Sequence, residues 1–255
     1  MQTRSKSILV PEGLRAAQAP YQFLERGEGR YFGGFTALGV CSWRTITQDP
    51  ECPNDACGIR ANEAEWKQWI PCASHPQSCG IYIRVIGRSL GMGVNEINDL
   101  VQCAPLHDIG KLVIPEKILN APRALTPEER RIVNKHTTMG ANLIRKARKT
   151  DVAARSPWEI AIAMVEHHHE RWDGRGYPKG LKGKQIPKCA RMLALADTYD
   201  AIRSERPYKK GKPHEEAIEI IKEEAGCHLD PEMVEIFLDN ETEFGEISQG
   251  RKDCR

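Results

Sequence analysis

Helix-start signals recur along this chain from about residue 75 onward, and they constrain the fold more than any other feature. Thr126, Ser156 and Asp230 are each followed directly by a proline, and Glu follows Thr126 and Ser156 at the third position. A polar cap, a proline in the first turn and a glutamate three residues on are typical of α-helix N-termini. Pro187 and Pro213 are predicted to open two further helices. The sequence therefore predicts a succession of helices.

Apolar residues recur at intervals of three or four in the same region, as on one face of a helix. One stripe ends at Gly91, and a second follows Asn95 as its expected cap. The helix from Thr126 is predicted to run to about Lys146, so that His136 lies inside it. No β-rich run competes, and the predicted class is an all-α bundle with short connections. The two stripes are Tyr82, Val85, Ile86 and Leu90, and Ile97, Leu100, Val101 and Ala104.

The chain is divided into three parts by its composition. Residues 1–74 contain short fragments broken by Gly, Pro, Cys and Trp, without a sustained helical period. They are expected to be disordered, to form a small appendage, or not to belong to the fold. Residues 75–240 are expected to form one helical domain, and residues 241–255 a polar C-terminal tail. The long Gly- and Pro-rich segment from Asp173 to Pro187 is expected to be functional.

Charge and hydropathy exclude some classes of protein. The formal net charge of +2 over 255 residues gives no case for binding a nucleic-acid polymer. No stretch reaches the roughly 18 apolar residues of a membrane span. The apolar run Ile8–Val10 is too short for a secretory signal. The expected location is the cytoplasm.

The nine cysteines are odd in number and irregularly spaced, which argues against a disulfide framework. Scattered reduced thiols are the expected state. The alternative is a zinc site from Cys52, Cys57, Cys72 and Cys79, although their spacing fits no common zinc pattern.

Histidines and aspartates gather at the predicted helix ends and on one helix face. Asp197 and Asp200 lie one turn apart, and Asp197 directly follows the apolar run Leu193–Ala196. Burying an unpaired carboxylate costs several kcal/mol, so Asp197 is expected to have a cation beside it. Imidazole and carboxylate without thiolate suit Fe, Mn, Ni or Zn, and so many ligands favour two ions. A single buried histidine is more often a hydrogen-bonded core residue, and His167 is read as a capping or surface residue.

Four motifs, in order along the chain, resemble the HD-GYP family. His107-Asp108-Ile109-Gly110-Lys111 is similar to its HD signature, and residues 168–178, HHERWDGRGYP, to its HHExxDGxGYP motif. Residues 196–201, ADTYDA, and 206–208, RPY, are similar to two further family segments. The resemblance implies an HD-domain helical bundle with a Gly/Pro-rich GYP loop.

The resemblance also implies a metal site. Its ligands would be His107, Asp108, His136, His168, His169 and Asp197, with Asp108 bridging two divalent ions. These ions are expected to be Fe or Mn, with Ni or Zn as alternatives. His75 is a further candidate ligand. Many members have a Glu where this chain has Pro71, and proline cannot coordinate a metal, so no third metal is expected.

The family hydrolyses cyclic di-GMP to pGpG and often onward to GMP, and the resemblance implies the same for this chain. Lys111 would face the substrate phosphate, and Arg206 and Lys209 would hold the other phosphate. A hydroxide shared by two ions would be the nucleophile, with Asp200 orienting it or Lys111. Tyr177 would stack on a guanine or dock a partner, such as a GGDEF-type signalling protein.

Two alternatives stay open from the sequence. One is a hydrolase of another cyclic dinucleotide, such as cyclic GMP-AMP. The other is a catalytically weak or inactive module that binds the nucleotide or a partner protein.

Overall fold

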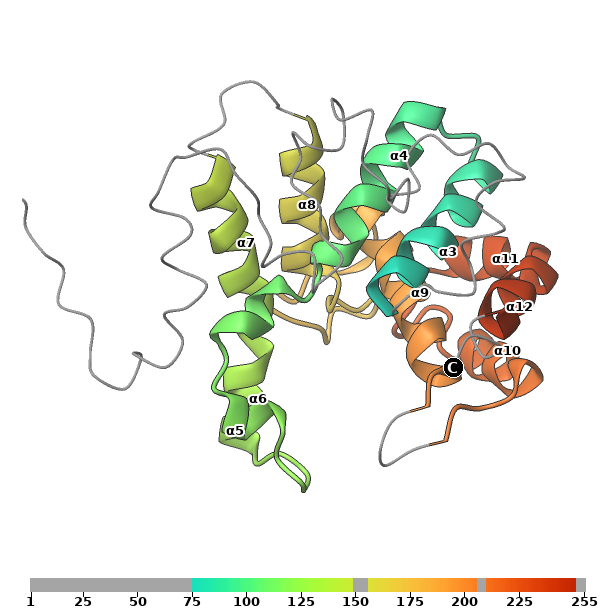
Figure 1. The fold of residues 1–255 in the computed structure, drawn as a ribbon. Coiled ribbons are helices and arrows are strands. Elements are labelled where there is room, and N and C mark those ends of the chain that lie inside the picture. The colour runs from blue at the N-terminus through green and yellow to red at the C-terminus, as the bar shows by residue number, and fades with distance from the viewer. Residues whose placement is uncertain (1–74, 149–155, 206–209, 251–255) are drawn as a thin grey trace, which may run out of the picture. The chain divides into compact units, whose positions relative to one another are not determined.

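The computed structural model describes residues 75–148, 156–205 and 210–250. Of residues 75–77 and 156, within these ranges, it describes the backbone but not the side chains. Within these ranges every element is helical and no strand occurs, which confirms the all-α class (Figure 1). The N-terminal segment 1–74 lies outside them, as do three of the four cysteines of the alternative zinc site. Arg206 and Lys209 lie outside them too.

Ten α-helices and three short 3₁₀ helices make up the described part of the chain. The α-helices are α3 (His75–Ser89), α4 (Val94–Cys103), α5 (Glu116–Leu119), α6 (Pro127–Asn134), α7 (His136–Arg148), α8 (Ser156–His167), α9 (Lys188–Arg203), α10 (His214–Glu223), α11 (Pro231–Asp239) and α12 (Glu241–Gly250). The 3₁₀ helices are η5 (Ala104–Leu106), η6 (Ile109–Val113) and η7 (Gly183–Gln185).

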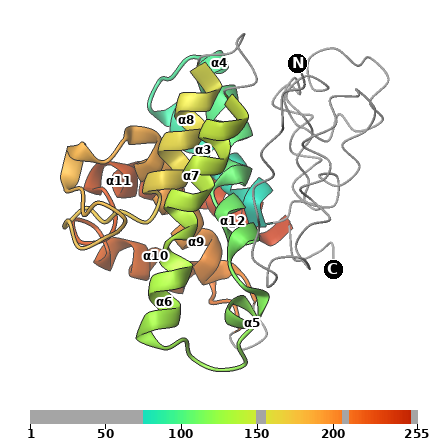
Figure 2. The same cartoon turned by 90° about the vertical axis from the view of Figure 1, so that its left-hand side faces the viewer.

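The described helices pack in two groups, and both α3 and α9 contact helices of each group. In one group α7 packs along α8, and α4 packs against α8 and α3. In the other, α10, α11 and α12 gather around α9 and α3, as Figures 1 and 2 show from two directions. The longest described helix, α9, contacts α3, α8, α10 and α11. This helix is apolar on most sides because neighbours cover it all round, and ten of its residues are buried.

Most helix starts follow the predicted signals. The Thr126 hydroxyl accepts a hydrogen bond from Glu129 N at 3.2 Å, and the Glu129 carboxylate accepts one from Thr126 N at 2.9 Å. The Asp230 carboxylate accepts from Glu232 N at 3.0 Å at the start of α11. The second helix is an exception, because α4 begins at Val94 with Gly93 rather than Asn95 as its cap.

The single helix predicted from Thr126 to about Lys146 is wrong, because α6 ends at Asn134 and α7 begins at His136. The break lies at Lys135, whose N–H donates to Ile132 O, one residue short of the helical pattern. A tertiary contact lies directly beside the break. The backbone of Gly110 passes so close to α7 that a Cβ there would lie 1.8 Å from His136 O.

The predicted polar tail is also wrong for residues 241–250, which form α12. Phe244 is fully buried, and its ring stacks on Tyr82 of α3 with centroids 4.8 Å apart. It meets Tyr199 and Phe237 edge to face at 5.3 and 4.9 Å. The helical unit therefore continues beyond residue 240, and α12 packs onto α3.

No helix among the described residues has the length and apolar character that a membrane crossing needs.

Candidate metal centre

Four segments far apart in the sequence bring the predicted ligands together. His107 and Asp108 lie in the turn between η5 and η6, and His136 is the first residue of α7. His168 and His169 follow the end of α8 directly, and Asp197 lies in the middle of α9. The α4 segment leads into η5, so the site lies where α4, α7, α8 and α9 converge.

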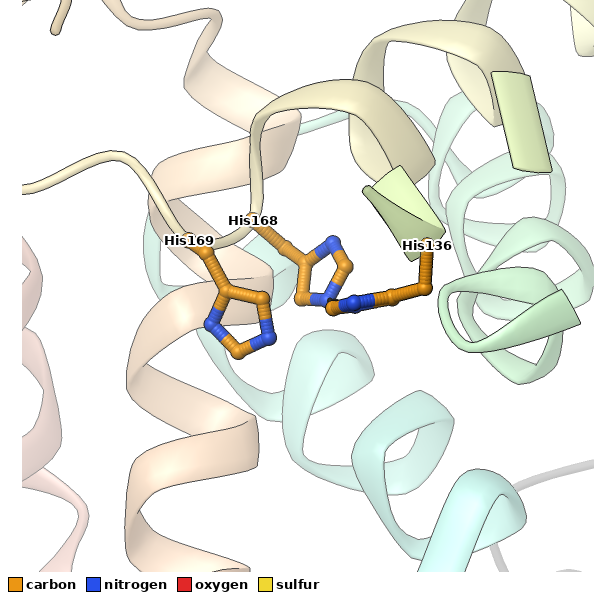
Figure 3. A group of neighbouring side chains, drawn as sticks. All are labelled: His136, His168 and His169. Atoms are coloured by element: carbon orange, nitrogen blue, oxygen red, sulfur yellow. Dashed lines mark hydrogen bonds between the residues drawn. The ribbon is translucent and has the colours of Figure 1, made fainter. Parts of the chain in front are cut away.

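Three of the histidines form a compact cluster. Each of His136, His168 and His169 offers a ring nitrogen, and these three atoms lie within 4.8 Å of one another (Figure 3). His136 Nε2 and His168 Nε2 are 3.4 Å apart. The ring of His107 meets that of His168 edge to face, with centroids 5.3 Å apart. Four imidazoles thus gather at one place.

Asp108 stands between two of these imidazoles. Its Oδ2 lies 3.5 Å from His107 Nε2, and its Oδ1 lies 3.4 Å from His136 Nε2. Lys111 Nζ, one turn along η6, donates to Oδ2 at 2.6 Å. The two carboxylate oxygens therefore face different histidines.

Backbone carbonyls orient three of the rings. His107 Nδ1 lies 2.8 Å from Ala104 O, and His136 Nδ1 lies 2.7 Å from Val133 O. His168 Nδ1 lies 3.0 Å from Val165 O. In the tautomer with the proton on Nδ1, each ring donates to its carbonyl and keeps the lone pair on Nε2, the arrangement usual for metal-binding imidazoles.

Burial controls the protonation of the cluster. It lowers the pKa of His136 and His168, and it lowers that of His169 to about 4 despite the attraction of Asp197. Burial also opposes charge on His107, but the neighbouring Asp108 carboxylate outweighs it and raises the pKa of His107. Three of the four rings are therefore neutral at pH 7, as metal binding requires.

Burial would likewise raise the pKa of Asp108, but His107 and Lys111 outweigh it and hold the pKa well below the usual range. Asp108 is therefore ionised. Its Oδ1 is buried and accepts no hydrogen bond from any residue that the structure describes. A buried, ionised oxygen without a donor is costly, and a cation would stabilise it.

The donor set fits divalent metal ions. Nitrogen and oxygen ligands lie about 2.0–2.2 Å from such an ion, so two ligands of one ion stand about 3–4 Å apart. The separations of 3.4 and 3.5 Å around Asp108 lie in this range. Neutral imidazoles, one ionised carboxylate and no thiolate suit the hard-to-borderline metals. The residues present therefore fit the group that the motifs imply.

The two aspartates of α9 have different surroundings. Asp197 is half-buried, and its charge favours protonation of His107, His168 and His169, which places it beside the cluster. Asp200 is fully buried, and its Oδ2 accepts a hydrogen bond from Ser204 Oγ at 3.0 Å at the end of the helix. Its catalytic role stays a prediction.

Of the other residues predicted to act in the site, the structure describes the side chains of some and not of others. The Lys111 side chain is 42% exposed beside Asp108, and the Tyr177 ring stacks on His169 with centroids 4.9 Å apart. His75 begins α3, but its side chain lies outside the described residues, as do Arg206 and Lys209 entirely.

The prediction of His167 as a surface residue is wrong, because only 7% of it is exposed, and its capping role stays a prediction. Its ring lies 3.8 Å from both Glu166 and Glu170. Glu170 is a residue whose contacts no sequence signal disclosed. Its carboxylate accepts hydrogen bonds from Lys179 N and Leu181 N at 2.7 and 2.9 Å. The third letter of the HHE motif was the only hint that this residue matters.

Comparisons with known proteins agree with the fold and the motifs. The family model described as HD domain matches residues 68–233. A Thermotoga maritima protein named cyclic di-GMP phosphodiesterase is 41% identical over 179 residues, which make up 70% of this chain and 47% of that protein. A Vibrio cholerae protein named 3'3'-cGAMP-specific phosphodiesterase 2 is 33% identical over 171 residues, 67% of this chain and 32% of that protein.

A solved structure of a HDG"Y"P protein from Bdellovibrio bacteriovorus has the same fold. It matches with a TM-score of 0.51 and 22% identity, over 65% of this chain and 50% of that chain. The chain spans about half or less of the length of each of these proteins. The family match covers more than half of the chain, and the HD and HHE–GYP motifs lie within it. The chain therefore belongs to the HD domain family and, by these motifs, to its HD-GYP members.

Proposed function

We propose that this site hydrolyses a phosphodiester bond of a cyclic dinucleotide, and that the substrate is cyclic di-GMP. The observation that carries the proposal is the meeting of four imidazoles around the ionised carboxylate of Asp108. The similar protein from Thermotoga maritima, named a cyclic di-GMP phosphodiesterase, supports the choice of substrate. The products would be pGpG and then GMP.

Two divalent metal ions, Fe or Mn, are proposed as the cofactors, with Ni or Zn as alternatives. His107, Asp108, His136, His168, His169 and Asp197 would hold them. When bound, such ions polarise the phosphate and lower the pKa of water toward neutrality. The two oxygens of Asp108 face different imidazoles, which supports a bridging role for this carboxylate. His75 is proposed as a further ligand.

The remaining residues would bind and orient the nucleotide. The partly exposed ammonium of Lys111 would stabilise negative charge that develops on the phosphate oxygens. The position of Asp200, one turn beyond Asp197, supports a role in orienting Lys111 or the attacking water. Tyr177 would pack against a base or a partner such as a GGDEF-type signalling protein, and Arg206 and Lys209 would hold the second phosphate.

A second candidate substrate is 3'3'-cGAMP. A similar Vibrio cholerae protein is named as specific for it. A catalytically inactive binding module is the other alternative. The residues proposed to hold the metal argue against it. Without a metal, Asp108 Oδ1 would be buried and would accept no hydrogen bond from a described residue.

The test is a panel of nucleotides with chromatography of the products, on protein purified without air and analysed for metal. Cyclic di-GMP should be converted to pGpG, and 3'3'-cGAMP more slowly. Asp108→Ala should lose metal and turnover together, because the variant removes the carboxylate that contacts two of the imidazoles. Glu235→Ala, an exposed position on α11, is the control. Full turnover by metal-free protein would contradict the proposal.

A further inference from the structure

The ring of His169 is held differently from the other imidazoles of the centre. His107, His136 and His168 each place Nδ1 within 3.2 Å of a backbone carbonyl three or four residues earlier. No described residue makes a hydrogen bond to the ring of His169. This ring is instead stacked on Tyr177, with centroids 4.9 Å apart and planes at 29°. Stacking therefore takes the place of the hydrogen bond that usually orients a metal-binding imidazole.

The loop that carries Tyr177 is anchored by one buried carboxylate. The side chain of Glu170 is fully buried. Its Oε1 accepts a hydrogen bond from Lys179 N at 2.7 Å, and its Oε2 accepts one from Leu181 N at 2.9 Å. With one oxygen on each of these two amides, the carboxylate closes the loop of residues 170–181 on itself.

The path of the loop between Glu170 and Tyr177 has little freedom. A Cβ on Gly176 would lie 2.3 Å from Arg171 N and 2.6 Å from the carbonyl carbon of Glu170. Tyr177 N donates to His169 O at 3.1 Å. The loop therefore returns to the chain segment that carries the metal-site histidines, and a shift of its anchored end would move the ring of Tyr177.

We propose that Glu170 is a positioning residue of the metal centre, which acts through the loop and Tyr177 to set the ring orientation of His169. The inference rests on the proposed metal centre but not on the identity of the nucleotide. Glu170 touches neither the ring of His169 nor the substrate. Its effect would pass through the amides of Lys179 and Leu181 to the ring of Tyr177, which precedes them in the loop.

The experiment compares Glu170→Gln, Tyr177→Ala and the double variant, using the full chain freed of metal and titrated with cobalt(II). Glutamine keeps the shape but places an NH₂ donor against one of the two backbone N–H groups. Both single variants should bind cobalt about 10–100-fold more weakly, the usual effect of losing a contact that orients a ligand. Their visible absorption bands should shift in the same way. Because the two residues act in series, the double variant should be no worse than Tyr177→Ala alone.

Two controls separate positioning from general loss of charge or stability. Glu166→Gln removes a buried carboxylate from the same helix end, but Glu166 contacts the side chains of Arg145 and Lys179 rather than the loop backbone. Its cobalt spectrum should equal that of the wild type. Tyr177→Phe keeps the stacked ring and should keep the spectrum as well. Amide hydrogen exchange at Lys179 and Leu181 should accelerate in Glu170→Gln only.

The outcomes separate this inference from the proposed function. A cobalt spectrum and affinity of Glu170→Gln equal to those of the wild type, with only a lower melting temperature, would overturn the positioning role. Additive losses in the double variant would overturn it too. If wild-type protein binds cobalt but hydrolyses no cyclic dinucleotide, the proposed function fails and the cobalt comparison still decides the role of Glu170. If it binds no cobalt, both proposals fail.

Discussion

At the scale of single residues, Lys111 and Asp108 form the pair on which the charge of the site depends. Lys111 Nζ donates to Asp108 Oδ2 at 2.6 Å, while Oδ1 stays without a hydrogen bond from a described residue. One oxygen is thus neutralised by the protein, and the other is left for a cation. The long, partly exposed stem of Lys111 also lets the ammonium reach a substrate phosphate.

Lys111→Ala should lower kcat/KM by about 10²–10³-fold, the usual cost of losing one group that stabilises transition-state charge. The metal content should stay close to that of the wild type, because the imidazoles and Asp108 remain. Steady-state kinetics beside metal analysis would check this. Loss of metal in parallel with activity would show instead that Lys111 acts by holding Asp108. Lys117→Ala, an exposed lysine of α5, is the control.

At the scale of elements, the close approach of η6 and α7 brings Asp108 to His136. A Cβ on Gly110 would lie 1.8 Å from His136 O and 2.7 Å from Gly140 N, so only glycine lets the two elements meet. The HD motif and His136 are far apart in the sequence, and this contact joins them. Gly110 is therefore required for the shape of the site, although it has no side chain.

Gly110→Ala should destabilise the fold by about 1–3 kcal/mol, the usual cost of overpacking, because η6 must move away from α7. The same movement would separate Asp108 from His136 and lower metal occupancy. Chemical denaturation and metal analysis would check both effects. Gly93→Ala is the matched control, since nothing lies within 4 Å of a Cβ at Gly93. Equal stability of the two variants would contradict the argument.

At the scale of the whole helical unit, α12 packs against α3. The aromatic rings of Phe244, Tyr82, Tyr199 and Phe237 pack with centroids 4.8–5.3 Å apart.

Phe244→Ala should lower the free energy of unfolding by about 3–5 kcal/mol, because it leaves a cavity in the core. Glu246→Ala, an exposed position on the same helix, should change it little. A loss below about 1 kcal/mol in Phe244→Ala would show that α12 is dispensable.

The buried imidazoles couple stability to pH. Burial lowers the pKa of His136, His168, His169 and His214 in the folded protein, whereas the unfolded chain binds protons near pH 6.5. The unfolded state then binds more protons below this pH, so stability is lost as pH falls from about 6.5 toward about 4. His107, whose pKa is raised, acts in the opposite direction.

Urea denaturation of the metal-free protein at several pH values would measure this loss, expected on the order of 2 kcal/mol between pH 7 and pH 5. His169→Asn should show a shallower dependence, because it removes the group whose pKa falls to about 4. A flat profile in both proteins would mean that the rings are solvated rather than buried.

The helices with polar caps and prolines, such as those after Thr126 and Asp230, were predictable, because capping and the loss of a backbone donor at proline act within a few residues. The candidate metal ligands were predicted from short motifs for a similar reason, since adjacent letters such as His168 and His169 are fixed by the turn they share. The break at Lys135 was missed; it lies beside a close contact with Gly110 on another segment, which the local pattern does not show.

The sequence by itself determined the helical class, most helix starts and the candidate ligands, since all of these follow from residue type and spacing along the chain. Only the tertiary structure decided which atoms meet. It showed that Asp108 faces two imidazoles with different oxygens and that Glu170 holds the loop of Tyr177. It also placed Phe244 and Ile247 of α12 in the core. The physical reason is that these contacts join segments distant in sequence, so packing between helices, rather than any local preference, sets their geometry.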